Sequence, residues 1–315
     1  MTNLTAGLLA RHTPKGPTGR SAALIDIAQD LLLNRLADLG LFEHLVFKGG
    51  TALRKLYAGS SGRFSTDLDF SILRAEDDPA SVTELLTEAI HGLVIDEFSY
   101  SIHLRRGRPI VAYQTPFGGV EGLSTKLDIG PPPWIPVTRR GWVKLPVHAA
   151  YPTSATLPVM ALVENMAEKV ARLNRVSPAR DVYDLVWVAG TTPHSTFDQP
   201  LLRRTAVLKC WVDLHGLHTP TASWLQIPGA RPFDPSRWLN VRTAADFDDQ
   251  DIGVLASPTP DLDALAGALS LRFAFLADLD EQEARWTQGR PEDRHQVIAA
   301  IKDLPGGRLA DAPLY

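Results

Sequence analysis

The sequence lacks the features on which secreted, membrane-spanning and thiol-dependent proteins rely. Cys210 is its one cysteine, which excludes an intrachain disulfide and a zinc site built from several cysteines. No apolar run approaches the roughly 18 residues that a membrane-spanning helix needs. The first residues, MTNLTAGLLARHTPKG, lack the apolar core of a signal peptide. We therefore expect a cytoplasmic protein that has no membrane partner.

The chain also lacks a dominant charge. Its 32 Lys and Arg against 36 Asp and Glu give a formal net charge of −4, which argues against a surface coated for non-specific nucleic-acid binding. Three local basic clusters are nevertheless present. They are Arg105, Arg106 and Arg108, then Arg139, Arg140 and Lys144, and finally Arg172, Arg175 and Arg180. Each cluster fits either part of a groove for an acidic partner or an ordinary solvated surface.

Length and composition indicate a soluble globular protein with room for two domains. The chain has 315 residues, of which 44% are hydrophobic and 22% are charged. Residues 1–20 are polar and interrupted by prolines, which predicts a flexible N-terminal arm. The segment 131–142, PPPWIPVTRRGW, is too rich in proline for a helix or a central strand and marks the expected domain junction. We therefore expect a first domain at 21–145 and a mainly helical C-terminal domain at 146–315.

Hydrophobic periodicity predicts a sheet in the first domain and helices in the second. The expected helices of the first domain are 21–40, 51–57 and 78–92, and its expected strands are 41–47, 67–72, 97–106, 108–116 and 122–130. The last three strands look like an antiparallel continuation of the sheet. The expected helices of the second domain are 157–173, 179–190, 194–216 and a long one at 261–286, with a loop region at about 217–260.

The stretch from Lys48 to Ile72, KGGTALRKLYAGSSGRFSTDLDFSI, contains the densest chemistry. In its LDFSI segment apolar and polar residues alternate, so a period of two puts Asp67 and Asp69 on one face of a strand. Neighbouring carboxylates repel each other, and a site tolerates such a pair when a divalent cation neutralises it. Asp128 alternates in the same way on the strand at 122–130, where a third carboxylate would complete a metal site.

A glycine turn precedes this strand. Gly49 and Gly50 allow the backbone to pass close to a ligand. Thr51 offers a hydroxyl where the helix at 51–57 begins, a place that attracts phosphate. Together with the carboxylates, the turn predicts a nucleotide held through phosphate and metal.

Lys169 lies on a largely apolar stripe of the helix expected at 157–173. A lysine in such a place either snorkels its ammonium out to water or points into a site. On the next helix Asp181 and Asp184 are three residues apart and therefore share a face. One interpretation is a surface ion pair between Arg180 and Asp184. The other is that the two acids bind a nucleotide or a metal, or orient Lys169.

Four sequence blocks in order resemble the AbiEii/AbiGii toxin family of nucleotidyltransferases, which includes the mycobacterial MenT toxins. The blocks, within residues 47–188, are FKGGTALRKLY with RFSTDLDF, then TKLDIG, ENMAEKVARL and ARDVYDLVWV. The resemblance implies an α+β fold in which a DNA polymerase β-like mixed sheet flanked by helices precedes a mainly helical C-terminal domain. That C-terminal domain is expected to complete the active site and to bind the acceptor.

The resemblance also implies roles for individual residues. Asp67 and Asp69 are expected to hold Mg²⁺, and Asp128 to help bind a second metal ion or to take the proton of the incoming hydroxyl. Lys169 is expected to neutralise the triphosphate, and Asp184 to orient that lysine or to contact the nucleotide. The other expected phosphate and nucleotide contacts are Gly49, Gly50, Thr51, Ser65 and Lys126, and the Ser65 hydroxyl is also a candidate for modification.

The implied activity is Mg²⁺-dependent transfer of a nucleotide from an NTP to the 3′ end of tRNA, with pyrophosphate as leaving group, which would block translation. A cognate antitoxin is a further candidate partner. One alternative is the same chemistry on a protein or small-molecule hydroxyl. Another is an inactive nucleotide- or RNA-binding regulator, which would be expected to have lost a carboxylate, although Asp67, Asp69 and Asp128 are all present. A dinucleotide-dependent enzyme does not fit, because GGTALRK lacks the G-x-G-x-x-G spacing.

Overall fold

The computed structural model describes residues 4–74, 77–118, 122–153, 155–191, 197–220, 222–240 and 243–315. The chain forms two compact units. The first unit contains Met1–Pro132, Val137–Val159 and Gly253–Pro258. The second unit contains Pro133–Pro136, Met160–Ile252 and Thr259–Tyr315. Within the described ranges, no helix is both long enough and apolar enough to cross a membrane.

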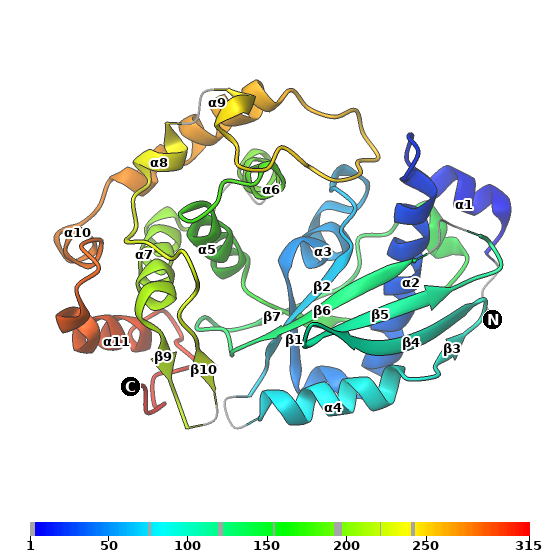
Figure 1. The fold of residues 1–315 in the computed structure, drawn as a ribbon, viewed down its shortest axis with the longest axis horizontal. Helices are drawn as coiled ribbons and strands as arrows, with labels where there is room; N and C mark the ends of the chain where they lie inside the picture. Colours follow the sequence, from blue (N-terminus) through cyan, green and yellow to red (C-terminus); the bar gives the residue numbers. More distant parts are fainter. Residues whose placement is uncertain are drawn as a thin grey trace. The chain divides into compact units, whose positions relative to one another are not determined.

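A mixed sheet forms the centre of the first unit. In the described residues its strand order is β3-β4-β5-β6-β2-β1-β8-β7 (Figure 1). The strands are β1 (Leu45–Lys48), β2 (Asp67–Ile72), β3 (Val94–Ile95), β4 (Phe98–Arg105), β5 (Arg108–Gln114), β6 (Ser124–Gly130), β7 (Thr138–Arg140) and β8 (Leu157–Val159). Strand β2 runs antiparallel to β1 and parallel to β6, while β4, β5 and β6 are antiparallel neighbours, as the sequence predicts.

The first unit also contains helices, of which α2 (Gly19–Asp38) is hydrogen-bonded to one face of this sheet. They are α1 (Ala6–His12), α2 (Gly19–Asp38), α3 (Gly49–Leu53) and α4 (Pro79–Ile90), with the short segments η1 (Leu41–Glu43), η2 (Arg54–Ala58), η3 (Gly59–Ser61) and η4 (Pro146–Ala149). The Tyr100 hydroxyl of β4 donates to the Ala28 carbonyl of α2 over 3.0 Å, and the Gln29 amide donates to the Thr125 hydroxyl of β6 over 3.1 Å. Tyr100 and Thr125 are buried, so this face of the sheet contributes to the core.

The second unit is mainly helical, as expected. Its helices are α5 (Leu162–Leu173), α6 (Ala179–Gly190), α7 (Gln199–His215), α8 (Ser236–Leu239), α9 (Leu262–Arg272), α10 (Glu281–Trp286) and α11 (Arg294–Lys302). The short segments are η6 (Ala244–Asp246), η7 (Ala274–Ala277) and η8 (Pro291–Asp293), and β9 (Leu217–His218) pairs with β10 (Ser223–Trp224). The start of the helix expected at 194–216 lies outside the described residues up to position 196.

Three local expectations are wrong. The expected arm at 1–20 contains α1, whose Thr5 side chain caps the helix and whose Leu9 is fully buried. The helix expected at 157–173 begins with strand β8 instead, because Val159 pairs with both β1 and β7. The long helix expected at 261–286 is divided into α9 and α10, because Asp280 accepts a hydrogen bond from the Glu283 amide and caps a new helix.

Candidate active site

The three predicted carboxylates lie on one face of the sheet in the first unit. Across β2 and β6, Asp67 pairs with Lys126 and Asp69 pairs with Asp128. Residues paired across strands point to the same face and lie on strands about 4.8 Å apart. All three carboxylates are half-exposed, whereas Leu68 between the first two is fully buried. The prediction that these residues alternate with buried ones and share one face is therefore confirmed. Two neighbouring strands contribute carboxylates to the same polar face of the sheet.

The glycine turn meets this centre at Asp69. Lys48, the last residue of β1, pairs with Asp69, and α3 begins at the next residue. Gly49 has a φ of +77°, and a Cβ at this position would lie 2.2 Å from Oδ2 of Asp69. A side chain there would collide with the carboxylate, in a backbone conformation that L-residues rarely adopt. Glycine at position 49 is therefore required by the carboxylate itself.

Thr51 fastens the beginning of β2 to α3. Its hydroxyl donates to the backbone carbonyl of Asp67, and the residue has no exposed surface. We infer that this hydroxyl positions Asp67. Ser65, two residues before β2, is also buried, at 9% exposure. The Lys126 ammonium forms an ion pair with the Asp128 carboxylate on the same strand face, and both side chains are partly exposed.

The donor set suits magnesium bound together with a nucleotide. Among the residues that the structure describes, no group of three or more His, Cys, Asp or Glu side chains is arranged to hold a metal ion. Mg²⁺ in nucleotide sites, however, generally uses one or two carboxylates plus substrate phosphates. Asp67 and Asp69 supply hard oxygen ligands of the kind that this arrangement needs.

Lys169 forms the centre of a buried ion cluster in the second unit. Its ammonium on α5 lies 2.9 Å from Oδ1 of Asp181 and 2.9 Å from Oδ2 of Asp184, both on α6. Arg172 lies 3.4 Å from the other oxygen of Asp181. The Lys169 side chain is only 8% exposed, so the snorkelling interpretation is wrong. Asp184 pairs with Lys169, which favours an orienting role over a surface pair with Arg180.

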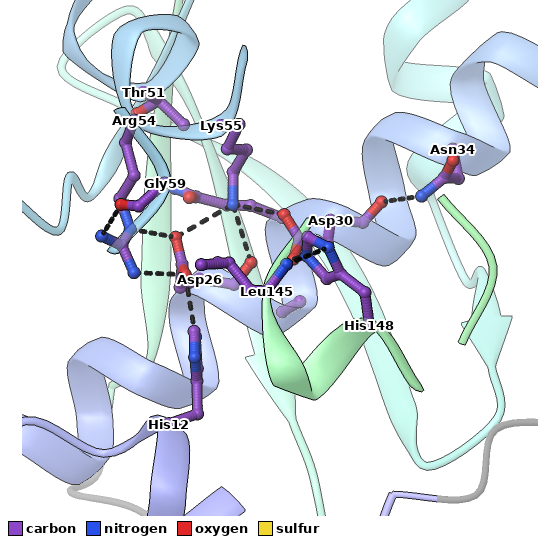
Figure 2. A network of polar contacts seen from close by, with 12 residues as sticks. His12, Asp26, Asp30, Asn34, Thr51, Arg54, Lys55, Gly59, Leu145 and His148 are labelled. Carbon is purple, nitrogen blue, oxygen red and sulfur yellow. Dashed lines mark hydrogen bonds and ion pairs between the residues drawn. The ribbon is translucent and has the colours of Figure 1, made fainter. Parts of the chain in front are cut away.

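A second buried charge network, in the first unit, has no counterpart among the expected site residues. Figure 2 shows Asp26 of α2 in contact with His12, Arg54 and Lys55. The Arg54 guanidinium donates to both Asp26 oxygens over 3.1 Å, and His12 Nε2 lies 2.9 Å from Oδ2. One turn further along α2, Asp30 contacts Lys55 and lies 3.2 Å from His148 Nε2. It also accepts a 2.8 Å hydrogen bond from the Tyr151 hydroxyl.

These contacts keep the acids charged inside the protein. Burial alone would raise the pKa of Asp26, but the attraction of Arg54 and Lys55 and the hydrogen bond to His12 outweigh it and hold the pKa well below its usual value. Burial also works against Asp30, yet Lys55 and His148 lower its pKa overall. The network is therefore a set of mutually neutralising buried ions rather than a set of protonated acids.

Arg54 connects this network to the loop before β2, the strand that contains Asp67 and Asp69. Its guanidinium donates to the carbonyls of Gly59 and Gly62 over 2.9 and 2.8 Å and lies 3.7 Å from the centre of the Phe64 ring. Those residues form the loop that enters β2 at Asp67. The FKGGTALRKLY block therefore contains two kinds of function, since its glycines adjoin the carboxylates and its Arg-Lys pair anchors the loop. An Asp pair four residues apart within the largely apolar segment 22–33 is the sequence signal that indicates such a network.

Comparisons with known proteins bear on the fold and the family of the chain. The family model described as "Nucleotidyl transferase AbiEii toxin, Type IV TA system" matches residues 31–285. The structure of MenT4, a nucleotidyltransferase toxin from Mycobacterium tuberculosis H37Rv, is 36% identical, with a TM-score of 0.82 over 96% of this chain and 99% of that chain. A cytoplasmic RNA terminal U-transferase covers 90% of this chain and 80% of its own at 15% identity, but its TM-score of 0.23 gives it no weight. A comparison with curated proteins gives no match.

The fold class and the toxin resemblance are thereby confirmed. The family model spans parts of both units, and the match to the MenT4 structure covers nearly the whole chain at 36% identity. The chain belongs to the AbiEii nucleotidyltransferase toxin family of type IV toxin–antitoxin systems, which implies a cognate antitoxin.

Proposed function

We propose that this chain transfers a nucleotide from an NTP to the 3′-terminal hydroxyl of a tRNA, with release of pyrophosphate, and so blocks translation in the cytoplasm. The observation that supports this most is the shared face of Asp67, Asp69 and Asp128 beside Gly49. Carboxylates on neighbouring strands next to a backbone turn without a side chain give room for a triphosphate and its metal ion.

In this proposal Asp67 and Asp69 hold Mg²⁺. The bound ion offsets the negative charge that develops on the phosphoryl oxygens. Gly49 and Gly50 allow the triphosphate to approach the backbone, while Thr51 holds the first residue of β2 in place. Asp128 would either help to bind a second metal ion or accept the proton of the attacking hydroxyl. Lys126, now paired with Asp128, is then a candidate to neutralise phosphate charge.

Ser65, Lys169 and Asp184 have further proposed roles. Ser65 precedes the carboxylate strand and is a candidate contact for the nucleotide. Lys169 would neutralise triphosphate charge, with Asp184 orienting its ammonium, as the 2.9 Å contact between them supports. The exposed arginines at positions 105, 106 and 108 support RNA as the acceptor, because phosphates bind best where cations are gathered.

A second candidate acceptor is a protein hydroxyl or a small molecule. The net charge of −4 favours it over RNA in one respect, since an acidic chain attracts nucleic acid only locally. An inactive regulator is less well supported, because every proposed carboxylate is present and Gly49 still accommodates Asp69.

The test is transfer of label from each of the four NTPs, with Mg²⁺, to total tRNA or to a protein lysate. We expect labelled tRNA 3′ ends, and we expect Asp67→Ala to abolish labelling while the far-UV circular dichroism stays that of the wild type. Labelled protein with unlabelled tRNA would overturn the RNA assignment. Transfer by the Asp67→Ala variant would remove Asp67 from the metal site.

A further inference from the structure

The carboxylate face of the sheet continues beyond β6 onto two more strands. Lys126, the partner of Asp67, also pairs with Ile110 of β5, which in turn pairs with His103 of β4. One row further along, Ser124 pairs with Ala112, and Ala112 pairs with Ser101. Because paired residues share a face, these side chains lie on the same side as Asp67 and Asp69.

In the part of the chain that the structure describes, this continuation of the carboxylate face is open to solvent. Ser101 and His103 of β4 are exposed, and Ile110 and Ala112 of β5 are half-exposed. The alternate residues of these strands point to the other face of the sheet, where side chains are buried. Tyr100, Val111, Tyr113 and Thr125 are all buried, against the side that α2 covers. The sheet therefore has one packed face and one accessible polar face that leads to the carboxylates.

A basic turn ends this accessible face. Arg105 and Arg108 pair across the β4–β5 hairpin, and Arg106 lies in the turn between them. All three are exposed, and among the described residues no hydrogen bond or ion pair engages their side chains. Asp96 and Glu97 lie in the turn before β4, at its opposite end. Three positive charges are thus concentrated at one end of the hairpin without neutralising partners.

The two other basic clusters are partly engaged by the protein. The Arg140 guanidinium lies 4.1 Å from the centre of the Tyr57 ring and donates to the Leu56 carbonyl over 3.3 Å. Arg175 forms an ion pair with Asp213. A cation already paired with a carboxylate contributes less to binding an external anion, because the two charges largely cancel. The hairpin cluster is therefore the one best suited to an external polyanion.

We propose that the single-stranded 3′ end of the acceptor RNA lies across β4, β5 and β6 with phosphates against Arg105 and Arg108, and that its terminal hydroxyl reaches Asp67, Asp69 and Asp128. This inference rests on the proposed function. From β4 to β2 the path crosses three strand spacings of about 4.8 Å each, a span that a few nucleotides cover. Ser101, His103, Ile110 and Ala112 include one ring, the His103 imidazole, on which a base could stack. Binding on this face therefore depends mainly on phosphate charge and tolerates sequence.

The test compares the double variant Arg105→Glu, Arg108→Glu with Arg35→Glu. Replacing both members of the cross-strand pair keeps a like-charged pair in the hairpin, so the change in local repulsion is small. Arg35 is exposed on α2, which packs against the opposite face, and Arg35→Glu serves as the control for a charge reversal away from the hairpin. A third variant, Arg105→Gln with Arg108→Gln, removes the charge without reversing it and keeps the test valid if the Glu variant folds poorly.

We expect the Glu variant to raise the KM for tRNA about tenfold at low salt, with kcat and the affinity for NTP unchanged and with a smaller effect from the Gln variant. Loss of two phosphate contacts reduces the slope of log affinity against log salt by about 1.4. The control should match the wild type. A KM for tRNA equal to that of the control would overturn the hairpin surface and leave the proposed function intact. A wild-type protein that labels no RNA would overturn the hairpin surface and the proposed function together. If the Glu variant were defective only in transfer to a protein acceptor, this face would bind protein and not RNA.

Discussion

The carboxylate of Asp69 lies where a side chain on residue 49 would have to be. A Cβ on Gly49 would fall 2.2 Å from Oδ2 of Asp69 and 3.0 Å from its Cγ. Glycine is thus required at position 49 for two reasons, which are the left-handed φ of +77° and the contact with the neighbouring Asp69 carboxylate. The glycine turn and the strand that contains Asp69 therefore depend on each other for their geometry.

Gly49→Ala should therefore abolish nucleotide transfer to a degree that its loss of folding stability does not explain. A left-handed L-residue costs about 1–2 kcal/mol, and the methyl group must also displace the Asp69 carboxylate. Gly92→Ala is the matched control, because Gly92 has a φ of +71° with nothing within 4 Å of its Cβ position. We expect similar losses in the free energy of unfolding from the backbone strain, but loss of nucleotide transfer only at position 49. Equal activity in the two variants would contradict this.

Asp26→Asn should destabilise the first unit strongly. The substitution leaves Arg54 and Lys55, which are 2% and 4% exposed, without their shared counterion. Removing one partner of a buried ion pair costs about 3–5 kcal/mol. Asp38→Asn, at an exposed position of the same helix, should change the free energy of unfolding by less than about 0.5 kcal/mol. Urea unfolding followed by circular dichroism measures both, and equal midpoints would show that the network contributes nothing.

The same network predicts acid lability. The pKa values of Asp26 and Asp30 are lowered in the folded protein, so the unfolded chain binds more protons at acidic pH. Their stabilisation is fully present above the unfolded value of about 3.9 and is lost as pH falls through the folded values. Urea midpoints should therefore decrease steeply below pH 4, and less steeply in Asp26→Asn. A flat profile from pH 5 to pH 2 would be inconsistent with buried, ionised acids.

Lys169→Met separates a structural role from a catalytic one. It leaves Asp181 and Asp184, at 1% and 5% exposure, with less neutralising charge, so the melting temperature should decrease. If the ammonium also neutralises triphosphate charge, the KM for NTP of the folded protein should rise at least tenfold at a temperature well below the melting transition. Lys169→Arg keeps the charge and should recover part of that affinity. An unchanged KM for NTP with a lower melting temperature would restrict Lys169 to packing.

Short-range sequence patterns predicted that the three carboxylates share a face of the sheet, but they missed the buried ion network around Asp26 and Asp30. Alternation alone placed Asp67, Asp69 and Asp128 on one face, because a strand has a fixed period of two. The partners of α2 are remote in sequence, and His148 lies 118 residues after Asp30, so no local pattern could pair them. From Ala22 to Leu33 helix α2 is largely apolar, and Asp26 and Asp30 are the two charged residues in that segment. Only the folded chain brings their cations to them.

Breaks within helical patterns were missed for a related reason. The segment 261–286 keeps helical spacing of apolar residues through its length, but capping by Asp280 favours a new start over continuation. Likewise, the composition of Leu157–Val159 is compatible with a helix or a strand, and pairing with β1 and β7 makes the segment a strand. Local preference was overridden by tertiary contacts in the second case and by a side-chain cap in the first.

Strand β2 has neighbours on both sides, β1 and β6, whereas β3 and β7 form the two borders of the sheet. Fraying begins at borders, where backbone amides face solvent. Deuterium should therefore enter the amides of Asp67–Ile72 among the last in the protein, at rates set by global unfolding. Heat inactivation of transfer will then coincide with the cooperative melt, because the acids keep their spacing until the whole unit opens.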